Sequence, residues 1–226
     1  MAYIKEYLSN NDIFKDIDPT LAAELHNKLI MRKYKKKVLI FMEGEPADFI
    51  YFILQGKVKL SKLSDHGQEK IVQIIQSGQF FGEIPALDGG AHPLTAETIE
   101  EAEIGLLSIL EFNAYLRENP QLAYGMMEIM AKRMRQAFRQ IKNLALKNTH
   151  SRLAIRLYKL SREYGVEMGE GVFIRATFTH QELANMIGTS RETVSRILRE
   201  FEKSGILKVV RQKITIINME KLKESF

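Results

Sequence analysis

The clearest alternation of apolar and polar positions lies between Thr179 and Phe201, and it predicts two short helices joined by a tight turn. Thr179 and Glu182 have the spacing of a capping box at the start of the first helix. Gly188 can end that helix in a left-handed conformation, after which Thr189-Ser190 cap the second. Apolar residues at i, i+3, i+4 and i+7 give the second helix one buried face: Val194, Ile197, Leu198 and Phe201.

The opposite side of the second helix is polar and suits the major groove of DNA. Arginine can donate to guanine O6 and N7, glutamate can accept from cytosine N4, and serine can do either. The DNA contacts that we expect in this stretch are Thr179, His180, Gln181, Ser190, Arg191, Glu192, Ser195, Arg196 and Arg199. Two alternatives stay open. The polar side is only a solvated surface, as in a small-molecule-binding module that acts through protein contacts, or Glu192 serves only in the cap of Thr189.

The segments around the two helices extend this unit. Two apolar runs follow, with Arg211-Gln212 between them, and a basic hairpin after such a helix is typical of a wing. The full set of expected elements is a helix at Ser151–Tyr164, a loop at Gly165–Gly171, strands at Val172–Ile174, Ile206–Val210 and Lys213–Ile217, and a short helix at Met219–Phe226.

From Val38 to about Leu110 the pattern changes to short apolar runs separated by turn residues, which predicts a small β-barrel or sandwich. A short helix should precede it, from Asp18-Pro19 to near Met31, and the charged run Lys33–Lys37 should be a solvated entry to the first strand. The expected strands are Phe49–Leu54, a run through Val58 and Leu60, Lys70–Ile74, Thr95–Thr98 and Glu103–Leu107, with turns at Gln55-Gly56 and Asp65–Gln68 and a helix at Glu111–Glu118.

Between these two regions the pattern predicts one long helix, residues 119–148. Its apolar positions step by three and four, which is the heptad seam of a two-fold dimer. The expected dimer residues are Met127, Met130, Met134, Ala137, Ile141 and Leu144. The alternative is a helix that packs only on its own β-domain. The chain is therefore expected to be α+β, with domains at 1–118 (effector-binding β-barrel), 119–148 (dimerisation helix) and 149–226 (winged helix-turn-helix).

Charge supports a nucleic-acid partner for the C-terminal half. The net charge of +5 divides into −5 over residues 1–119 and +10 over residues 120–226, so the basic half is the one with the helix-turn-helix. No cysteine is present, which excludes a disulfide and a cysteine-bound iron–sulfur cluster. We expect a cytoplasmic protein without a membrane segment. No motif for a nucleophile with its base, a phosphate loop or a metal cluster is found, so we do not expect an enzyme.

This combination of parts resembles the Crp/Fnr family of bacterial transcription regulators over essentially the whole chain. The resemblance is strongest at Ser190–Arg196 and Phe201–Leu207. Arg191, Glu192 and Arg196 match one recognition pattern of the family, and Glu192, Ser195 and Arg196 match another. The resemblance implies a homodimer on double-stranded DNA with TGTGA-like or TTGAT-like half-sites, and RNA polymerase as a further partner.

The β-region resembles the cyclic-nucleotide-binding fold at Gly44, Asp48, Gly56, Phe80–Glu83 and Ala96. By this resemblance the effector pocket would include Phe81, Gly82, Glu83, His92 and Thr95. The arginine that holds a cyclic phosphate in the family is missing from Ala91–Thr95, and Pro93 offers no N–H. We therefore expect an effector other than cAMP, of unknown identity.

Haem-based sensing of nitric oxide or redox state is an alternative that the same resemblance allows. The stretch Gly89–Glu97 is similar to that of relatives with such a sensor. One histidine would then ligate haem: His26, His66, His92, His150 or His180. For His180 we instead expect a contact with a DNA phosphate.

Overall fold

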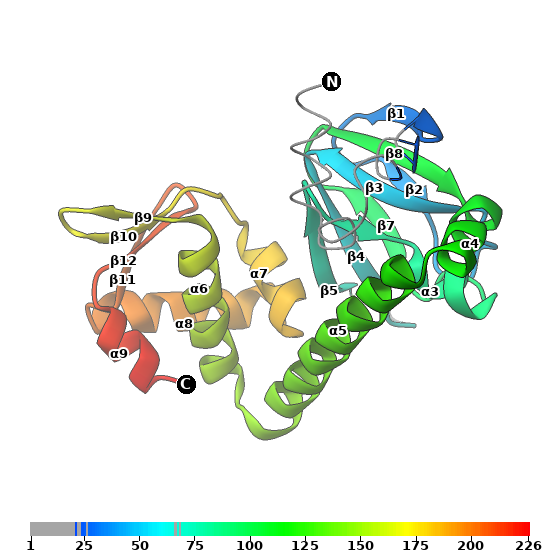
Figure 1. Ribbon diagram of the computed structural model, residues 1–226. Coiled ribbons are helices and arrows are strands. Elements are labelled where there is room, and N and C mark those ends of the chain that lie inside the picture. The colour runs from blue at the N-terminus through cyan, green and yellow to red at the C-terminus, as the bar shows by residue number, and fades with distance from the viewer. Residues whose placement is uncertain (1–20, 22–23, 26, 66, 68) are drawn as a thin grey trace. The chain divides into compact units, whose positions relative to one another are not determined.

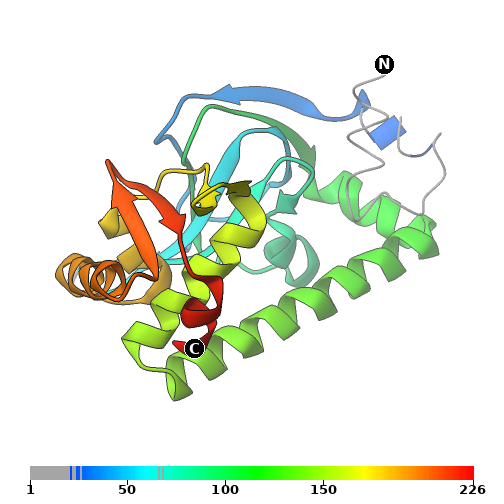
Figure 2. The same ribbon diagram turned by 90° about the vertical axis from the view of Figure 1, so that its left-hand side faces the viewer.

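The computed structural model describes residues 21–226 except 22–23, 26, 66 and 68. Over these residues the chain is α+β and divides into two compact units (Figure 1). The first comprises the described residues up to 62 together with 72–136, and the second comprises 63–71 and 137–226. Helix α5 (Pro120–Leu146) is continuous across residue 136 (Figure 2). Within the described part of the chain, no helix is long and apolar enough to cross a membrane.

Two four-stranded antiparallel sheets build the β-region, in the orders β1-β8-β3-β6 and β2-β7-β4-β5. Their inner faces share one apolar core, to which Phe41, Ile53, Val58 and Ile104 contribute. The strands are β1 (Ile30–Tyr34), β2 (Leu39–Phe41), β3 (Phe49–Gln55), β4 (Lys57–Leu63), β5 (Glu69–Gln76), β6 (Phe80–Phe81), β7 (Thr95–Thr98) and β8 (Ala102–Ser108).

Strand β3 is buried on both faces because helices cover its outer side. Tyr51 and Ile53 point into the core between the sheets, whereas Ile50 and Phe52 pack against the helices α3 (Glu83–Asp88), α4 (Ile109–Glu118) and the first half of α5. The turn from β3 to β4 needs a glycine. Gly56 has φ 89°, and a Cβ there would lie 2.2 Å from the carbonyl oxygen of Glu101.

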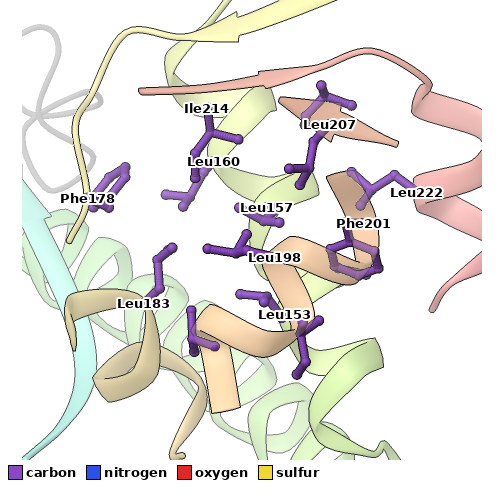
Figure 3. Packing of buried hydrophobic residues seen from close by; sticks show 14 of the residues in the cluster. Leu153, Leu157, Leu160, Phe178, Leu183, Leu198, Phe201, Leu207, Ile214 and Leu222 are labelled. Carbon is purple, nitrogen blue, oxygen red and sulfur yellow. The ribbon is translucent and has the colours of Figure 1, made fainter. Parts of the chain in front are cut away.

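The second unit is built around a single apolar core from helices and two hairpins (Figure 3). Leu157 of the first helix lies in this core together with Leu183, Leu198 and Ile214. The elements are α6 (Thr149–Tyr164), β9 (Gly165–Met168), β10 (Gly171–Ile174), α7 (His180–Ile187), α8 (Arg191–Lys203), β11 (Leu207–Val210), β12 (Lys213–Ile216) and α9 (Met219–Glu224). The strands form one sheet in the order β11-β12-β10-β9.

Two expectations about strands were wrong. The first strand begins at Ile30 rather than after the charged run, because β1 lies at a sheet edge where its side chains can stay exposed while its backbone pairs with β8. The segment Gly165–Met168 is a strand rather than a loop. Its backbone pairs with β10, and Gly169 lies in the turn between the two strands.

The expected helix from Asp18-Pro19 lies mostly outside the described residues. Its described part is helical at Leu21, Glu24, Leu25 and Asn27 and ends before the expected Met31. Two expected features, the turn at 65–68 and the candidate ligands at positions 26 and 66, also include residues that the structure does not describe.

Candidate DNA-recognition surface and effector site

Helix α8 has one buried and one polar side, as its sequence predicts. Ser190 is its N-cap and accepts a hydrogen bond from the backbone N–H of Thr193 at 3.2 Å. The four predicted apolar side chains are at most 2% exposed, and burying each contributes about 1.5–3 kcal/mol to folding. Residues of the other side are exposed, except for half-buried Ser195: Arg191, Glu192, Arg196 and Arg199.

Helix α7 begins with the predicted capping box. Oγ1 of Thr179 accepts from the backbone N–H of Glu182 at 3.1 Å, and the Glu182 carboxylate accepts from the backbone N–H of Thr179 at 2.7 Å. Gly188 ends the helix with φ 69°, and its N–H donates to Ala184 O at 2.9 Å. These local contacts set the tight turn that places α8 after α7.

Several residues expected to contact DNA have side-chain partners across or along the two helices in this structure. Nδ1 of His180 lies 2.7 Å from Oγ of Ser195, and Nε2 of Gln181 donates to Oδ1 of Asn185 at 2.7 Å. Arg196 donates to Glu200, four residues later, at 2.7 Å, with its side chain 65% exposed. An exposed pair of this kind contributes less than about 1 kcal/mol, so Arg196 can exchange Glu200 for a base at small cost.

The cap of α8 settles the alternative role of Glu192. Ser190, not Thr189, is the N-cap, so Glu192 is the second residue of the helix and not the third. Hydrogen bonds to its own backbone N–H and to the Ser190 hydroxyl lower the pKa of Glu192. The carboxylate is therefore ionised and can act as an acceptor at neutral pH.

Strands β11 and β12 form the predicted wing. Arg211 and Gln212 join them with φ values of 49° and 66°, the two left-handed residues of a type I′ turn. The carboxylate of Glu202 accepts from the backbone N–H of Val209 at 2.8 Å and so fastens the wing to α8. The wing also carries Lys208 and Lys213, both exposed, which gives it three basic side chains near the turn.

In the first unit, Glu83 has a cation as its partner. The carboxylate is buried and forms an ion pair with Arg133 of α5. Arg133 also donates to Phe80 O at 2.7 Å and lies over the Phe80 ring, 4.7 Å from its centroid. The sequence showed that the stretch Ala91–Thr95 lacks an arginine, but it did not show that Arg133, 50 positions after Glu83, pairs with this carboxylate.

The remaining expected pocket residues lie close to the barrel core. Phe81 is fully buried and stacks on Tyr51, with ring centroids 4.9 Å apart. His92 is 3% exposed and stacks on Phe41, with ring centroids 3.5 Å apart and an angle of 5° between the ring planes. Gly82 has φ 84° and precedes α3, while Oγ1 of Thr95 accepts from the backbone N–H of Glu43 at 3.0 Å. These residues share one region, which is mainly aromatic.

The described histidines offer little support for haem. His92 has one face covered by Phe41, His150 has its ring edge-on to Phe201 with centroids 4.5 Å apart, and His180 is bonded to Ser195. Burial also lowers the pKa of His92 against the opposing effect of Glu45 and Asp48. Among the residues that the structure describes, no cluster of three or more potential metal-ligating side chains occurs.

Helix α5 carries an exposed apolar stripe. Of the expected seam residues, Met127, Met134, Ile141 and Leu144 are 45–63% exposed, and Ala137 is exposed as well. Met130 instead is half-buried against the core of the first unit. Phe138, which the sequence analysis left out, is 61% exposed. A heptad series that shares Met127, Met134 and Ile141 with the expected seam takes the next residue at each alternate position: Tyr124, Met127, Ala131, Met134, Phe138, Ile141 and Ala145.

Comparison with known proteins agrees with both units. Residues 31–119 match the cyclic nucleotide-binding domain, and residues 151–225 match the Crp-like helix-turn-helix domain. The global nitrogen regulator of Nostoc sp. is 31% identical, with 83% of this chain and 85% of that protein covered. A CRP-like cAMP-activated global transcriptional regulator of Mycobacterium tuberculosis is 27% identical, with coverage of 96% and 97%.

Solved structures show the same fold. A Crp/Fnr-family transcriptional regulator of Thermus thermophilus superposes with a TM-score of 0.70 at 27% identity and covers 86% of this chain and 97% of its own. The c-di-GMP-responsive regulator CLP of Xanthomonas campestris has a TM-score of 0.80 at 22% identity, with coverage of 89% and 100%, and so supports the fold alone. These four proteins are all described as regulators, and none as an enzyme. The chain therefore belongs to the Crp/Fnr family of DNA-binding transcription regulators, with a cyclic nucleotide-binding domain followed by a Crp-like helix-turn-helix domain.

Proposed function

We propose that this regulator binds a two-fold symmetric DNA site as a homodimer, under the control of a small-molecule or redox/gas effector other than cAMP. The observation that carries the proposal is the polar side of α8, where arginine and glutamate side chains are exposed above a fully buried apolar face. Arg191, Glu192, Ser195 and Arg196 would read half-sites of the TGTGA or TTGAT kind. RNA polymerase is the partner expected for a regulator that acts at a promoter.

The homodimer is supported by the stripe on α5. Large apolar side chains exposed at heptad spacing would be covered by the same helix of a second copy. Two recognition helices related by a two-fold axis would meet successive major grooves about 34 Å apart. In this proposal residues 119–148 are the dimerisation helix, 1–118 the effector domain and 149–226 the DNA-binding domain.

The proposal of an effector other than cAMP rests on the segment between α3 and β7, residues 89–94. In the stretch Ala91–Thr95, where the family resemblance puts an arginine, Leu94 packs against the barrel core and Pro93 has no N–H for a phosphate. Arg133 is already paired with the carboxylate of Glu83. The effector would act by binding two dimer states with different affinity, since a ligand shifts an equilibrium only by that difference.

Replacement of Arg196 with alanine tests the DNA-reading role. We expect a loss of about 1–3 kcal/mol in binding free energy and a weaker preference at one base pair of each half-site. The measurement is fluorescence anisotropy with symmetric duplexes that carry TGTGA or TTGAT half-sites, each against a scrambled duplex at fixed salt.

Arg162→Ala is the matched control, because it removes the same charge from α6. The buried faces of α6 and α8 meet in one core, so the exposed Arg162 points away from the polar side of α8. We expect its effect on sequence preference to be negligible. Equal effects of both substitutions, or no preference of the wild type for any symmetric duplex, would contradict the proposal.

A further inference from the structure

His180 and Ser195 are joined across the two helices of the reading unit. His180 is the first residue of α7 and Ser195 lies in the second turn of α8, with 2.7 Å between Nδ1 and Oγ. Both side chains are half-buried. Ser195 shares its side of the helix with Glu192, Arg196 and Arg199. Its hydroxyl is therefore both a candidate DNA-reading group and the hydrogen-bond partner of an imidazole.

A serine hydroxyl has one hydrogen and two lone pairs, so the partner of that hydrogen decides what the oxygen can offer a base. If the hydroxyl of Ser195 donates to Nδ1, its oxygen remains an acceptor and suits the exocyclic amines of adenine and cytosine. If Nδ1 carries a hydrogen and donates instead, the hydroxyl hydrogen is free for guanine O6 and N7, thymine O4 or adenine N7. The state of one ring thus changes which bases the hydroxyl favours, and it does so most clearly for cytosine, which has no acceptor in the major groove.

The surroundings of His180 favour its neutral form. Burial lowers the pKa of His180, and the charges of Arg191 and Arg199 on α8 lower it further, against the opposite effect of Glu202. On α7 itself, the carboxylate of Glu182 is bonded to Thr179. Since the unprotonated nitrogen of neutral imidazole is a stronger acceptor than a hydroxyl oxygen, this form favours the tautomer in which the O–H donates to Nδ1.

We propose, resting on the DNA-binding function above, that His180 is a positioning residue for base recognition. It accepts the hydrogen of the Ser195 hydroxyl, so that Ser195 prefers adenine or cytosine at one position of each half-site. Protonation of the ring reverses this bond and moves the preference towards guanine or thymine. A contact of His180 with phosphate would carry no such base preference.

The test uses the full-length protein and four versions of it: wild type, His180→Phe, Ser195→Ala and the double variant. Phenylalanine keeps a ring of similar size but has no acceptor nitrogen. The probes are the tighter of the TGTGA and TTGAT duplexes and every symmetric single-base replacement in it. Affinities come from competition anisotropy at pH 7.5 and pH 5.5 at fixed salt, and a thermal melt checks that each variant is folded.

At pH 7.5 the wild type should prefer adenine or cytosine about 2- to 10-fold at one position, the range of a single neutral hydrogen bond. His180→Phe and Ser195→Ala should each remove this preference, and the double variant should remove no more. At pH 5.5 the wild-type preference should shift, whereas that of Ser195→Ala should not. If His180→Phe fails to fold, His180→Asn should keep DNA binding and lose the pH-dependent shift.

Two results would overturn the inference while leaving the DNA-binding function intact. In the first, His180→Phe weakens binding to all duplexes by the same factor, and the slope of log Kd against log salt concentration falls by about one unit. This result would indicate that His180 contacts a phosphate. The other is additive loss of preference in the double variant. If the wild type distinguishes no duplex from a scrambled one, the DNA-binding function fails and the inference fails with it.

Discussion

His92 has a different role in the structure from the one that its place in the sequence suggests. In the sequence it lies in the stretch Ala91–Thr95, which lacks the phosphate-binding arginine of the family, and it is a candidate ligand for an effector or haem. In the structure its ring is 3% exposed and stacks on Phe41, and its backbone is paired with the segment at Gly44 and Glu45. Its imidazole thus contributes to the aromatic core of the barrel, in the neutral form that burial favours.

This neutral form predicts a loss of stability in acid. The pKa of His92 is lower in the folded protein than its usual 6.5, so the unfolded chain binds more protons between the two values. The free energy of unfolding should therefore fall as the pH drops below about 6.5 and level off below the folded pKa. His92→Phe should show a flatter dependence in urea titrations from pH 8 to pH 5, with the part due to His180 remaining. Parallel curves for both proteins would contradict this prediction.

At the scale of an element, helix α5 has one face packed in the core of the first unit and another that carries an exposed apolar stripe. Its first half packs Leu122, Met126 and Ile129 into the core of the first unit, and Arg133 reaches Glu83 from the same half. The apolar stripe through Phe138 is exposed in the described chain, and in the proposed dimer it would face a second copy. Met130 shows the distinction, because its position suits either face and only the packing assigns it to the core.

Phe138→Glu should therefore break the proposed dimer. A carboxylate placed in the seam would be buried once from each copy, so we expect the dimer dissociation constant to rise about 100-fold or more. Sedimentation equilibrium measures this. Gln136→Glu is the matched control, because Gln136 is exposed on the opposite side of α5 and its charge would stay in water. If Phe138→Glu leaves the dimer dissociation constant unchanged, the stripe is not part of the dimer interface.

Over the whole molecule, the two halves of the chain carry net charges of opposite sign. The half up to residue 119 carries −5 and the half from residue 120 carries +10. Within the second unit the wing adds Lys208, Arg211 and Lys213 beside the arginines of α8. Such a basic surface binds phosphates and releases counterions, which supplies affinity without sequence preference.

DNA binding should consequently weaken steeply with salt. We expect log Kd to rise linearly with log salt concentration, and Lys213→Gln to lower the slope by about one unit if the side chain meets a phosphate. The same variant should weaken cognate and scrambled duplexes by similar factors, unlike Arg196→Ala. Titrations at four or more salt concentrations measure both effects. A slope that is unchanged in Lys213→Gln would place this side chain away from the DNA backbone.

The amino-acid sequence by itself determined the elements that local chemistry specifies. The capping box at Thr179, the turn at Gly188, the buried face of α8 and the two-residue hairpin at Arg211-Gln212 all agree with the structure. Each depends on residues a few positions apart, where helix periodicity and backbone preference act directly. The same holds for β4, where Val58 and Leu60 are buried and alternate with the half-buried Lys57 and Lys59.

Contacts between distant segments depended on the tertiary structure. Glu83 and Arg133 come from a short helix and the long helix, His180 and Ser195 from two helices of different direction, and β1 from a charged run that pairs only because β8 lies beside it. Periodicity states that a face is buried or exposed but not which side chain lies across from it. Those partners follow from how the chain packs within each unit, and here they decide which charges are paired, which histidines are buried and which face of α5 stays exposed.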